Sequence, residues 1–361
     1  MTIRFPLPFV VLGALAYTGS AAAQAGVEIP TPAEYAEAAA EAEAAALFQS
    51  EEPIQITLLT DIKWLRDKRI DTMEVDGTVT FRDLDGSMTE SPVEVRTRGN
   101  FRRDKRNCNF PPIRLDFPKS AMEGTVFEGQ DKLKLVSPCH DSRDDFQRYI
   151  YKEYLVYKLH ALITPISFRV RLVEITFVDI NDDYDSRTKI GFLIEDEEKM
   201  AERNSASFLD VEQFHPESMD GEGSVVASVF NYMIGNTDFS PVFFHNAKLI
   251  RIQDGRYLPV PYDFDFSGAV DTRYAAPAPS LSIRSVTDRL YRGFCRAELQ
   301  YEPVRALFDG QRQAVWDLYE GFTLLDEDHR EDVIEFFEDF YEVMDDPQKF
   351  DREIMQACRN W

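Results

Sequence analysis

Hydrophobic and polar positions alternate with a period of two along much of the chain between Ile54 and Val136. This alternation is typical of β-strands that bury one face. The dipeptides Asp76-Gly77 and Asp85-Gly86 lie between such segments and favour tight turns. The strands predicted here are Ile54–Leu59, Thr78–Phe81, Val93–Arg98, Ile113–Phe117 and Lys132–Val136.

The later pattern is mainly helical. Apolar residues recur every three to four positions over Phe146–Ile163, which predicts a helix. Further strands are predicted at Val170–Asp179, Lys189–Glu195, Lys248–Ile252 and Tyr257–Val260, and further helices at Ser224–Ile234 and 326–346. A β-rich half therefore precedes a helix-rich half, which predicts a two-lobed α+β protein with a ligand cleft between the lobes. We place the lobes at 51–196 and 197–361.

The first residues have the pattern of an export signal. Residues 1–23 contain Arg4, an apolar run from Phe9 to Tyr17, and small residues ending at Ala23, which is the layout of a secretory signal peptide. The run is shorter than the roughly 20 residues that a membrane span needs. We expect cleavage after Ala23 and a periplasmic or secreted chain that is free of the membrane, with an uncleaved anchor as the alternative. Residues 24–50, rich in Ala and Glu, predict an exposed helical spacer capped at Thr31.

The charge of the chain limits the kinds of partner that it can bind. The 361 residues include 64 acids and 40 bases, for a net charge of -24. Such a surface repels phosphate backbones, which argues against nucleic-acid binding. The composition does not indicate the oligomeric state.

The chain has four cysteines, and an even number in an exported protein suggests disulfides. Three pairings are possible. We favour Cys108–Cys139 and Cys295–Cys358, because each pair lies within one half of the chain. No C-x-x-C spacing supports a zinc site.

Candidate chemistry concentrates between residues 231 and 268. Asp238 follows a helix and a Gly-Asn turn, while Asp263 and Asp265 follow a strand and flank Phe264. Residues two apart in a strand face the same side, so both carboxylates can converge. With the amide oxygen of Asn246 they form a set of oxygen ligands that suits Mg²⁺, which is usually shared with substrate phosphates. The alternative is that these acids cap turns and bond to backbone amides.

These segments resemble those of the CotH-type (spore-coat) protein-kinase-like family and, locally, the HipA-type kinases. The shared features are a helix ending in Gly-Asn-x-Asp and a strand ending in Pro-x-x-Tyr-Asp. Arg96–Asn100 resembles the Arg-Gly-Asn element of the CotH type, Lys132–Val136 its next strand, and Gly191–Glu195 the strand that leads into its interlobe hinge. The resemblance covers about residues 90–270 and implies a bilobal atypical protein-kinase-like fold that binds ATP and Mg²⁺.

The resemblance also implies roles for single residues. Asp238 would be the catalytic acid that orients or deprotonates an acceptor hydroxyl. Asp263 or Asp265 would bind magnesium, and Asn246 would assist. Lys134 would contact the nucleotide phosphates and be held by an ion pair with Glu153. The elements that contain Arg96, Arg98 and Glu195 would contribute to cofactor binding.

The sequence departs from the kinase pattern at two points. Asp238 and Asn246 are eight residues apart, where the kinase pattern has five, so His245 could take the place of Asn246. No Gly-x-Gly-x-x-Gly loop is present, so the phosphates need other donors. The segment 96–106 holds six bases and one acid, and arginines bind phosphate by paired hydrogen bonds. The same segment could instead pair with the acidic surface of the protein.

The sequence thus favours an exported phosphotransferase that uses a magnesium nucleotide and phosphorylates a hydroxyl group on a protein or small molecule. Two alternatives remain: an inactive module that binds a metal or ligand on the same fold, and a metal-dependent phosphate-ester hydrolase. Export fits the hydrolase well, but two-metal hydrolase sites usually add His ligands, and the chain has only five histidines.

Overall fold

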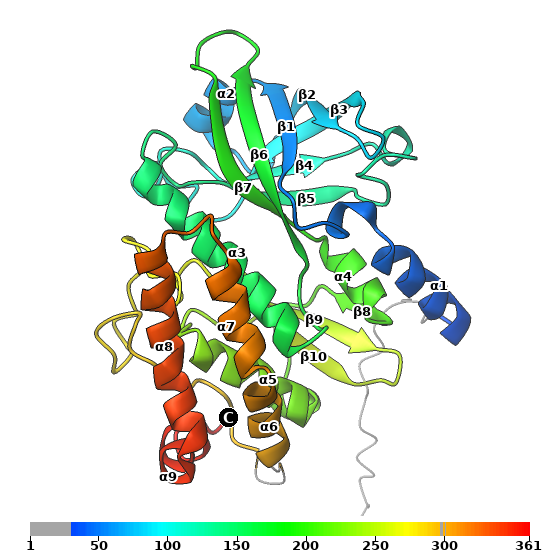
Figure 1. Cartoon of the computed structure of the whole chain (residues 1–361). Coiled ribbons are helices and arrows are strands. Elements are labelled where there is room, and N and C mark those ends of the chain that lie inside the picture. Colours follow the sequence, from blue (N-terminus) through cyan, green and yellow to red (C-terminus); the bar gives the residue numbers. More distant parts are fainter. Residues whose placement is uncertain (1–29, 297–298, 300) are drawn as a thin grey trace, which may run out of the picture.

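The computed structural model describes residues 30–296, 299 and 301–361. The predicted signal peptide lies outside these residues. Figure 1 shows a β-barrel above a group of helices, with α3 running between the two and a small sheet to one side. A β-rich half therefore does precede a helix-rich half.

Seven strands form the barrel in the order β1-β2-β3-β4-β5-β7-β6. Neighbouring strands are antiparallel except β1 and β6, which pair in parallel with Ile54 opposite Val173 and so close the sheet. The strands are β1 (Ile54–Thr60), β2 (Val75–Arg82), β3 (Met88–Thr97), β4 (Ile113–Asp116), β5 (Lys132–Val136), β6 (Val170–Asp179) and β7 (Arg187–Ile194).

This closure corrects the predicted fold. A bilobal protein-kinase-like fold has a β-sheet lobe, whereas the β-rich half here is a closed barrel accompanied by a separate three-stranded sheet. The two strands that close the barrel are more than 100 residues apart in the chain, and alternation of side chains does not specify which strands pair. The predicted turn at Asp76-Gly77 is also wrong, because both residues lie inside β2, opposite Glu94 and Val93. Asp85-Gly86 does form a turn between β2 and β3.

The remaining elements are a second, smaller sheet and the helices. The second sheet has the order β10-β9-β8, from β8 (Ala206–Leu209), β9 (Ala247–Ile252) and β10 (Tyr257–Pro261). The helices are α1 (Pro32–Glu43), α2 (Ile62–Lys68), α3 (Gln147–Ile163), α4 (Glu197–Arg203), α5 (Gly221–Met233), α6 (Glu302–Gly310), α7 (Arg312–Gly321), α8 (Glu327–Asp345) and α9 (Pro347–Phe350).

Helix α3 connects the two hydrophobic cores. It contacts β6 and β7 of the barrel and α7 of the helical half. Eleven of its 17 residues are buried, so it is enclosed by the protein over more than the single apolar stripe that its sequence suggests. One core fills the barrel, and the other lies around α3, α5 and α8. The position of α3 between them brings its side chains close to both halves.

Helix α1 is not the exposed spacer that its composition predicts. Its Tyr35 and Ala42 are buried, and it packs against α4. The Tyr35 hydroxyl lies 3.0 Å from Ser207 Oγ, and Arg169 donates a hydrogen bond to the carbonyl of Ala42. The predicted cap is confirmed, since Thr31 Oγ1 accepts a hydrogen bond from the Glu34 amide.

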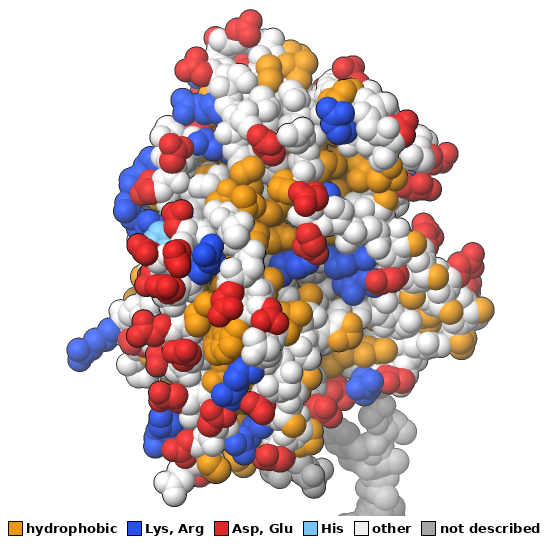
Figure 2. All heavy atoms as spheres, viewed as in Figure 1, with side chains coloured by type: hydrophobic (Ala, Val, Ile, Leu, Met, Phe, Trp, Pro, Cys, Tyr) orange, Lys and Arg blue, Asp and Glu red, His pale blue; other side chains and the backbone are white. Residues whose placement is uncertain are grey.

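Both predicted disulfides are present, Cys108–Cys139 in the first half and Cys295–Cys358 in the second. Disulfides persist in oxidising compartments, so the chain fits an extracytoplasmic environment. Within the described ranges, no helix is long and apolar enough to span a bilayer. Figure 2 shows acidic side chains over much of one face and a band of Lys and Arg where the barrel meets the helical half.

Candidate functional site

Asp238 is held by a series of asparagine side chains at the end of α5. Asn236 donates to Asn231 Oδ1 (2.8 Å), and its own Oδ1 accepts from the Asp238 amide (3.0 Å). Asn246 donates to the Asp238 carbonyl (2.8 Å) and to its Oδ2 (2.9 Å). These neutral contacts fix the carboxylate without burying it, because the side chain stays 39% exposed.

His245 contacts the other oxygen of the same carboxylate. Its Nε2 lies 2.8 Å from Asp238 Oδ1. This hydrogen bond and the charge of Asp238 raise the pKa of His245, although partial burial acts against the increase. The contact with His245 fixes the second carboxylate oxygen of Asp238 while the side chain stays partly exposed.

Two glycines bring the Asp238 loop beside the segment that carries Asp265. Gly235 ends α5 with a φ of 65°, and its carbonyl accepts a hydrogen bond from the Gly268 amide (3.2 Å). A Cβ atom at Gly235 would lie 3.3 Å from the Gly268 Cα atom, and one at Gly268 would lie 2.5 Å from the Val286 carbonyl oxygen. The close approach of these backbones therefore requires glycine and joins two parts of the predicted site.

Asp263 and Asp265 flank a buried Phe264, as expected, but they do not lie in a strand. The strand β10 ends at Pro261, and Asp263 has a φ of 62°, which is left-handed. The Asp263 amide donates to the Tyr157 hydroxyl (2.9 Å), which fixes this turn against α3. The two carboxylates are electrostatic neighbours because of this turn, and not because of alternation along a strand.

Asp265 is 5% exposed. Its Oδ2 accepts a hydrogen bond from the Tyr274 hydroxyl (2.9 Å). Burial and the neighbouring charge of Asp263 raise the pKa of Asp265 to about 7, while Arg102 opposes the increase. A carboxylate in this position is under-compensated by the protein, and a bound cation would stabilise its ionised form.

Glu153 is the buried acid of α3. It is 2% exposed, and its carboxylate has no hydrogen bond or ion pair to any described residue. Burial, Asp265 and Asp263 raise its pKa, whereas Arg102 and Arg98 lower it. Glu153 therefore lies close enough to both aspartates for their charges to act on it.

That predicted partner, Lys134, pairs elsewhere. Its Nζ lies 2.6 Å from Glu197 Oε1, and Lys248 Nζ lies 3.2 Å from the same atom. Both ammonium groups sit over the ring of Tyr262, at 5.1 and 5.3 Å from its centroid. The predicted Lys134–Glu153 ion pair is therefore wrong, and Lys134 belongs to a cation cluster next to the acids.

Three predicted cofactor-binding residues have separate surroundings. Glu195 is buried and accepts four hydrogen bonds from Arg169 and Arg203, which leaves its carboxylate no free capacity for a ligand. Arg96 contacts the Asp71 carbonyl and Glu74. Arg98 lies nearer the acids, since it lowers the pKa of Glu153, and its buried Nε has no partner among the described residues. Of the three, Arg98 alone is placed to act at the site.

The donor set fits Mg²⁺ in chemical type. Asp263 and Asp265 offer hard carboxylate oxygens, and Asn246 uses its amide nitrogen on Asp238, which leaves its oxygen free. Within the described residues, no group of three or more His, Cys, Asp or Glu side chains is arranged to hold a metal. Mg²⁺ is commonly bound by one or two carboxylates together with water and substrate phosphates. A site with two carboxylates therefore agrees with its usual coordination.

Sequence reasoning missed several residues at the site. Tyr157 lies one helical turn after Glu153, and this spacing could have revealed it. Arg102 stood out only as one of six bases in its segment. Tyr274, Glu197 and Lys248 carry no signal in the sequence that marks them.

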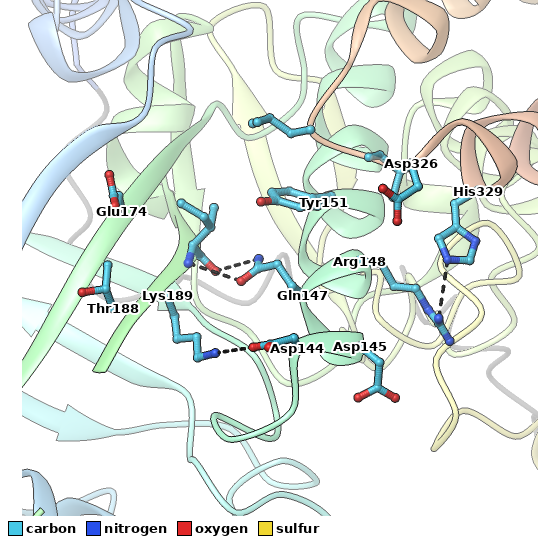
Figure 3. A pocket seen from close by; sticks show the side chains of 13 residues that line it. Asp144, Asp145, Gln147, Arg148, Tyr151, Glu174, Thr188, Lys189, Asp326 and His329 are labelled. Carbon is cyan, nitrogen blue, oxygen red and sulfur yellow. Dashed lines mark hydrogen bonds and ion pairs between the residues drawn. The ribbon is translucent and has the colours of Figure 1, made fainter. Parts of the chain in front are cut away.

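A separate pocket of about 610 Å³ opens at the start of α3. Figure 3 shows two pairs among its charged groups, Lys189 with Asp144 (3.0 Å) and Arg148 with His329 (3.5 Å). Tyr151 lines this pocket, and roughly 200° of helical rotation separates it from Glu153. The pocket and the acidic residues thus lie on different sides of α3.

Comparison with family models, curated proteins and solved structures found no match for the chain. The resemblance to the CotH type and the HipA type is neither supported nor refuted by these comparisons.

Proposed function

We propose that the chain is an exported phosphotransferase that uses a magnesium nucleotide, with ATP as the expected donor, and phosphorylates a hydroxyl group on a protein or small molecule. Periplasmic or secreted placement, with residues 1–23 as a cleaved signal, is part of this proposal. The observation that carries it is the partly exposed Asp238 carboxylate, which His245 and Asn246 orient beside the Asp263–Asp265 segment.

Each residue of the site has a role in this proposal. Asp238 binds the acceptor hydroxyl and receives its proton. His245 and Asn246 hold that carboxylate in position. Asp263 and Asp265, with Asn246, would hold the metal, which supplies neutralisation of the charge on the transferred phosphate. Phosphoryl transfer needs positioning and electrostatic stabilisation more than covalent help, so this set of groups is sufficient.

The second candidate is a module that binds the same ligand without turnover. It is favoured by one observation: both oxygens of Asp238 already accept or share hydrogen bonds with side chains of the protein. An acceptor hydroxyl must share one of these oxygens for catalysis to occur.

The test is transfer of the labelled γ-phosphate of ATP to casein and to the chain itself, in the presence of Mg²⁺. Asp238→Asn should abolish transfer and leave the dissociation constant for the magnesium nucleotide within about threefold. Asp254→Asn is the matched control, because Asp254 lies in the exposed β9–β10 hairpin and pairs with Arg256. Full activity of Asp238→Asn would refute the proposed role. Nucleotide binding without transfer would favour the binding module, and phosphate release from p-nitrophenyl phosphate would favour the hydrolase.

A further inference from the structure

The loop between β3 and β4 crosses from the barrel to the helical half. Its Phe101 ring packs edge-on against Phe266 at 4.9 Å and lies 5.4 Å from the ring of Tyr274. Phe266 follows Asp265 directly, and the Tyr274 hydroxyl donates to the Asp265 carboxylate. The next residue of the loop, Arg102, is thereby brought to the acidic site.

Arg102 is buried there with most of its hydrogen-bonding capacity unused. It is 9% exposed, and its Nη2 donates to the Ser137 carbonyl. Its Nε is buried without a partner among the described residues. A guanidinium has five N–H donors in a planar fork, so Arg102 can donate to oxygen atoms besides the Ser137 carbonyl.

The carboxylates that face Arg102 do not satisfy it. Glu153, Asp263 and Asp265 all interact electrostatically with Arg102. Within the part of the chain described, none of the three forms a hydrogen bond or ion pair with Arg102. Glu153 is itself 2% exposed, and its carboxylate has no hydrogen-bonding partner among the described residues. Opposite charges in a buried setting normally come into contact, because an unpaired buried charge is costly. A ligand that carries charges of both signs would compensate Arg102 and the carboxylates together.

We propose that Arg102 binds the anionic phosphate group of a metal–phosphate ligand, while the carboxylates opposite bind its metal. This inference rests on the proposed function and names the phosphate-binding residue of that site. An anion alone would be repelled by the acids, and a cation alone would be repelled by Arg102. A phosphate that chelates a divalent metal presents oxygens to the guanidinium and positive charge to the carboxylates. The site therefore selects the pair over either component.

Covalent and polar contacts hold the loop in this position. The Cys108–Cys139 disulfide joins it to the segment that supplies Ser137. The Asn109 amide donates to the Cys139 carbonyl (3.0 Å), and Arg69 donates to the Cys108 carbonyl (2.8 Å). Arg102 is consequently fixed before any ligand arrives.

The neighbouring arginine provides a matched control. Arg103 occupies the same loop, but its Nη1 pairs with Asp71 Oδ1 (2.7 Å), away from the acids. Replacing either arginine removes one positive charge from the loop. Only replacement of Arg102 also removes a hydrogen-bond donor that faces Glu153, Asp263 and Asp265.

The experiment is calorimetric titration of the chain with inorganic pyrophosphate plus Mg²⁺, and with each component alone. We expect the wild type to bind the combination at least tenfold more tightly than pyrophosphate alone. Arg102→Met should weaken this binding at least tenfold and Arg102→Lys several-fold, while Arg103→Met should stay within twofold. Arg102→Lys keeps the charge, so it decides the question if Arg102→Met fails to fold.

Unchanged binding by a folded Arg102→Met or, in its absence, by Arg102→Lys would overturn the inference. So would equal losses at Arg102 and Arg103, or a wild type that binds neither pyrophosphate nor its magnesium complex. If magnesium pyrophosphate binds through Arg102 but no phosphate is transferred from ATP, the proposed function fails and the inference stands. The two claims are therefore tested separately.

Discussion

Breaking the two disulfides one at a time should separate stability from ligand binding. The double variant Cys108→Ala/Cys139→Ala releases the loop that carries Arg102, whereas Cys295→Ala/Cys358→Ala releases a link in the helical half. The cysteines of each pair are 31 and 63 residues apart. Loop-closure entropy then predicts losses of about 3.7 and about 4.3 kcal/mol in the free energy of unfolding.

These two losses are similar, so the two variants should be about equally stable, although their missing disulfides lie in different halves of the chain. Urea denaturation followed by circular dichroism measures the free energies of unfolding, and calorimetry in the absence of urea measures binding of the magnesium nucleotide. We expect the Cys108/Cys139 variant to bind at least tenfold more weakly than the wild type. The Cys295/Cys358 variant should bind within twofold of the wild type.

The reasoning would be refuted if both variants lost binding to the same extent, or if the Cys295/Cys358 variant lost more. Either result would mean that binding follows global stability and does not depend on the position of the Arg102 loop. Limited digestion with trypsin gives an independent readout. The released loop should be cut at its arginines in the first variant and stay protected in the second.

Three further predictions concern single residues. Because the pKa of Asp265 is raised in the folded state from an ordinary value of 3.8 to about 7, its contribution to stability is present below about pH 4 and is lost as the pH rises through 7. Relative to the wild type, Asp265→Asn should therefore gain stability between pH 4 and pH 7 in urea unfolding, and a constant difference would contradict the pKa. Glu195→Gln should lower the free energy of unfolding by about 3–5 kcal/mol, because it leaves two arginines without their buried carboxylate; a loss below about 1 kcal/mol would show that water replaces the carboxylate. Gly191→Ala should lower the free energy of unfolding by about 1–3 kcal/mol, because a Cβ atom there would lie 2.4 Å from the Val136 carbonyl oxygen. Gly310 has open space around it, so Gly310→Ala should lower the free energy of unfolding by less than about 0.5 kcal/mol.

The sequence was most informative where the physical cause is local. Alternation at Ile113–Phe117 and Lys132–Val136 identified strands because one face of each is buried in the barrel. The capping box at Thr31 is likewise a short-range pattern. The disulfides were predictable because each pair falls within one half of the chain.

The sequence was least informative about long-range pairing. Closure of the barrel depends on β1 meeting β6, and no residue in either strand specifies the other. Asp76-Gly77 has the composition of a turn, yet pairing on both sides places Gly77 in the middle of β2. The contribution of neighbouring strands outweighs local turn preference there.

The same contrast between local patterns and long-range contacts applies to the candidate site. The position of Asp238 on a fixed loop just after α5 could be inferred from the Gly-Asn turn before it. The partner of Lys134 could not, because Glu197 and Glu153 are equally plausible in sequence and only the tertiary structure selects Glu197. Arg102 was indistinguishable from its basic neighbours until burial separated it from Arg103.

The most direct test of the account is a calorimetric titration of the purified chain with ATP, once with Mg²⁺ and once with EDTA. The account predicts one binding site per chain, with an affinity that falls at least tenfold when the metal is removed. Absence of binding under both conditions, or equal affinity with and without the metal, would contradict it.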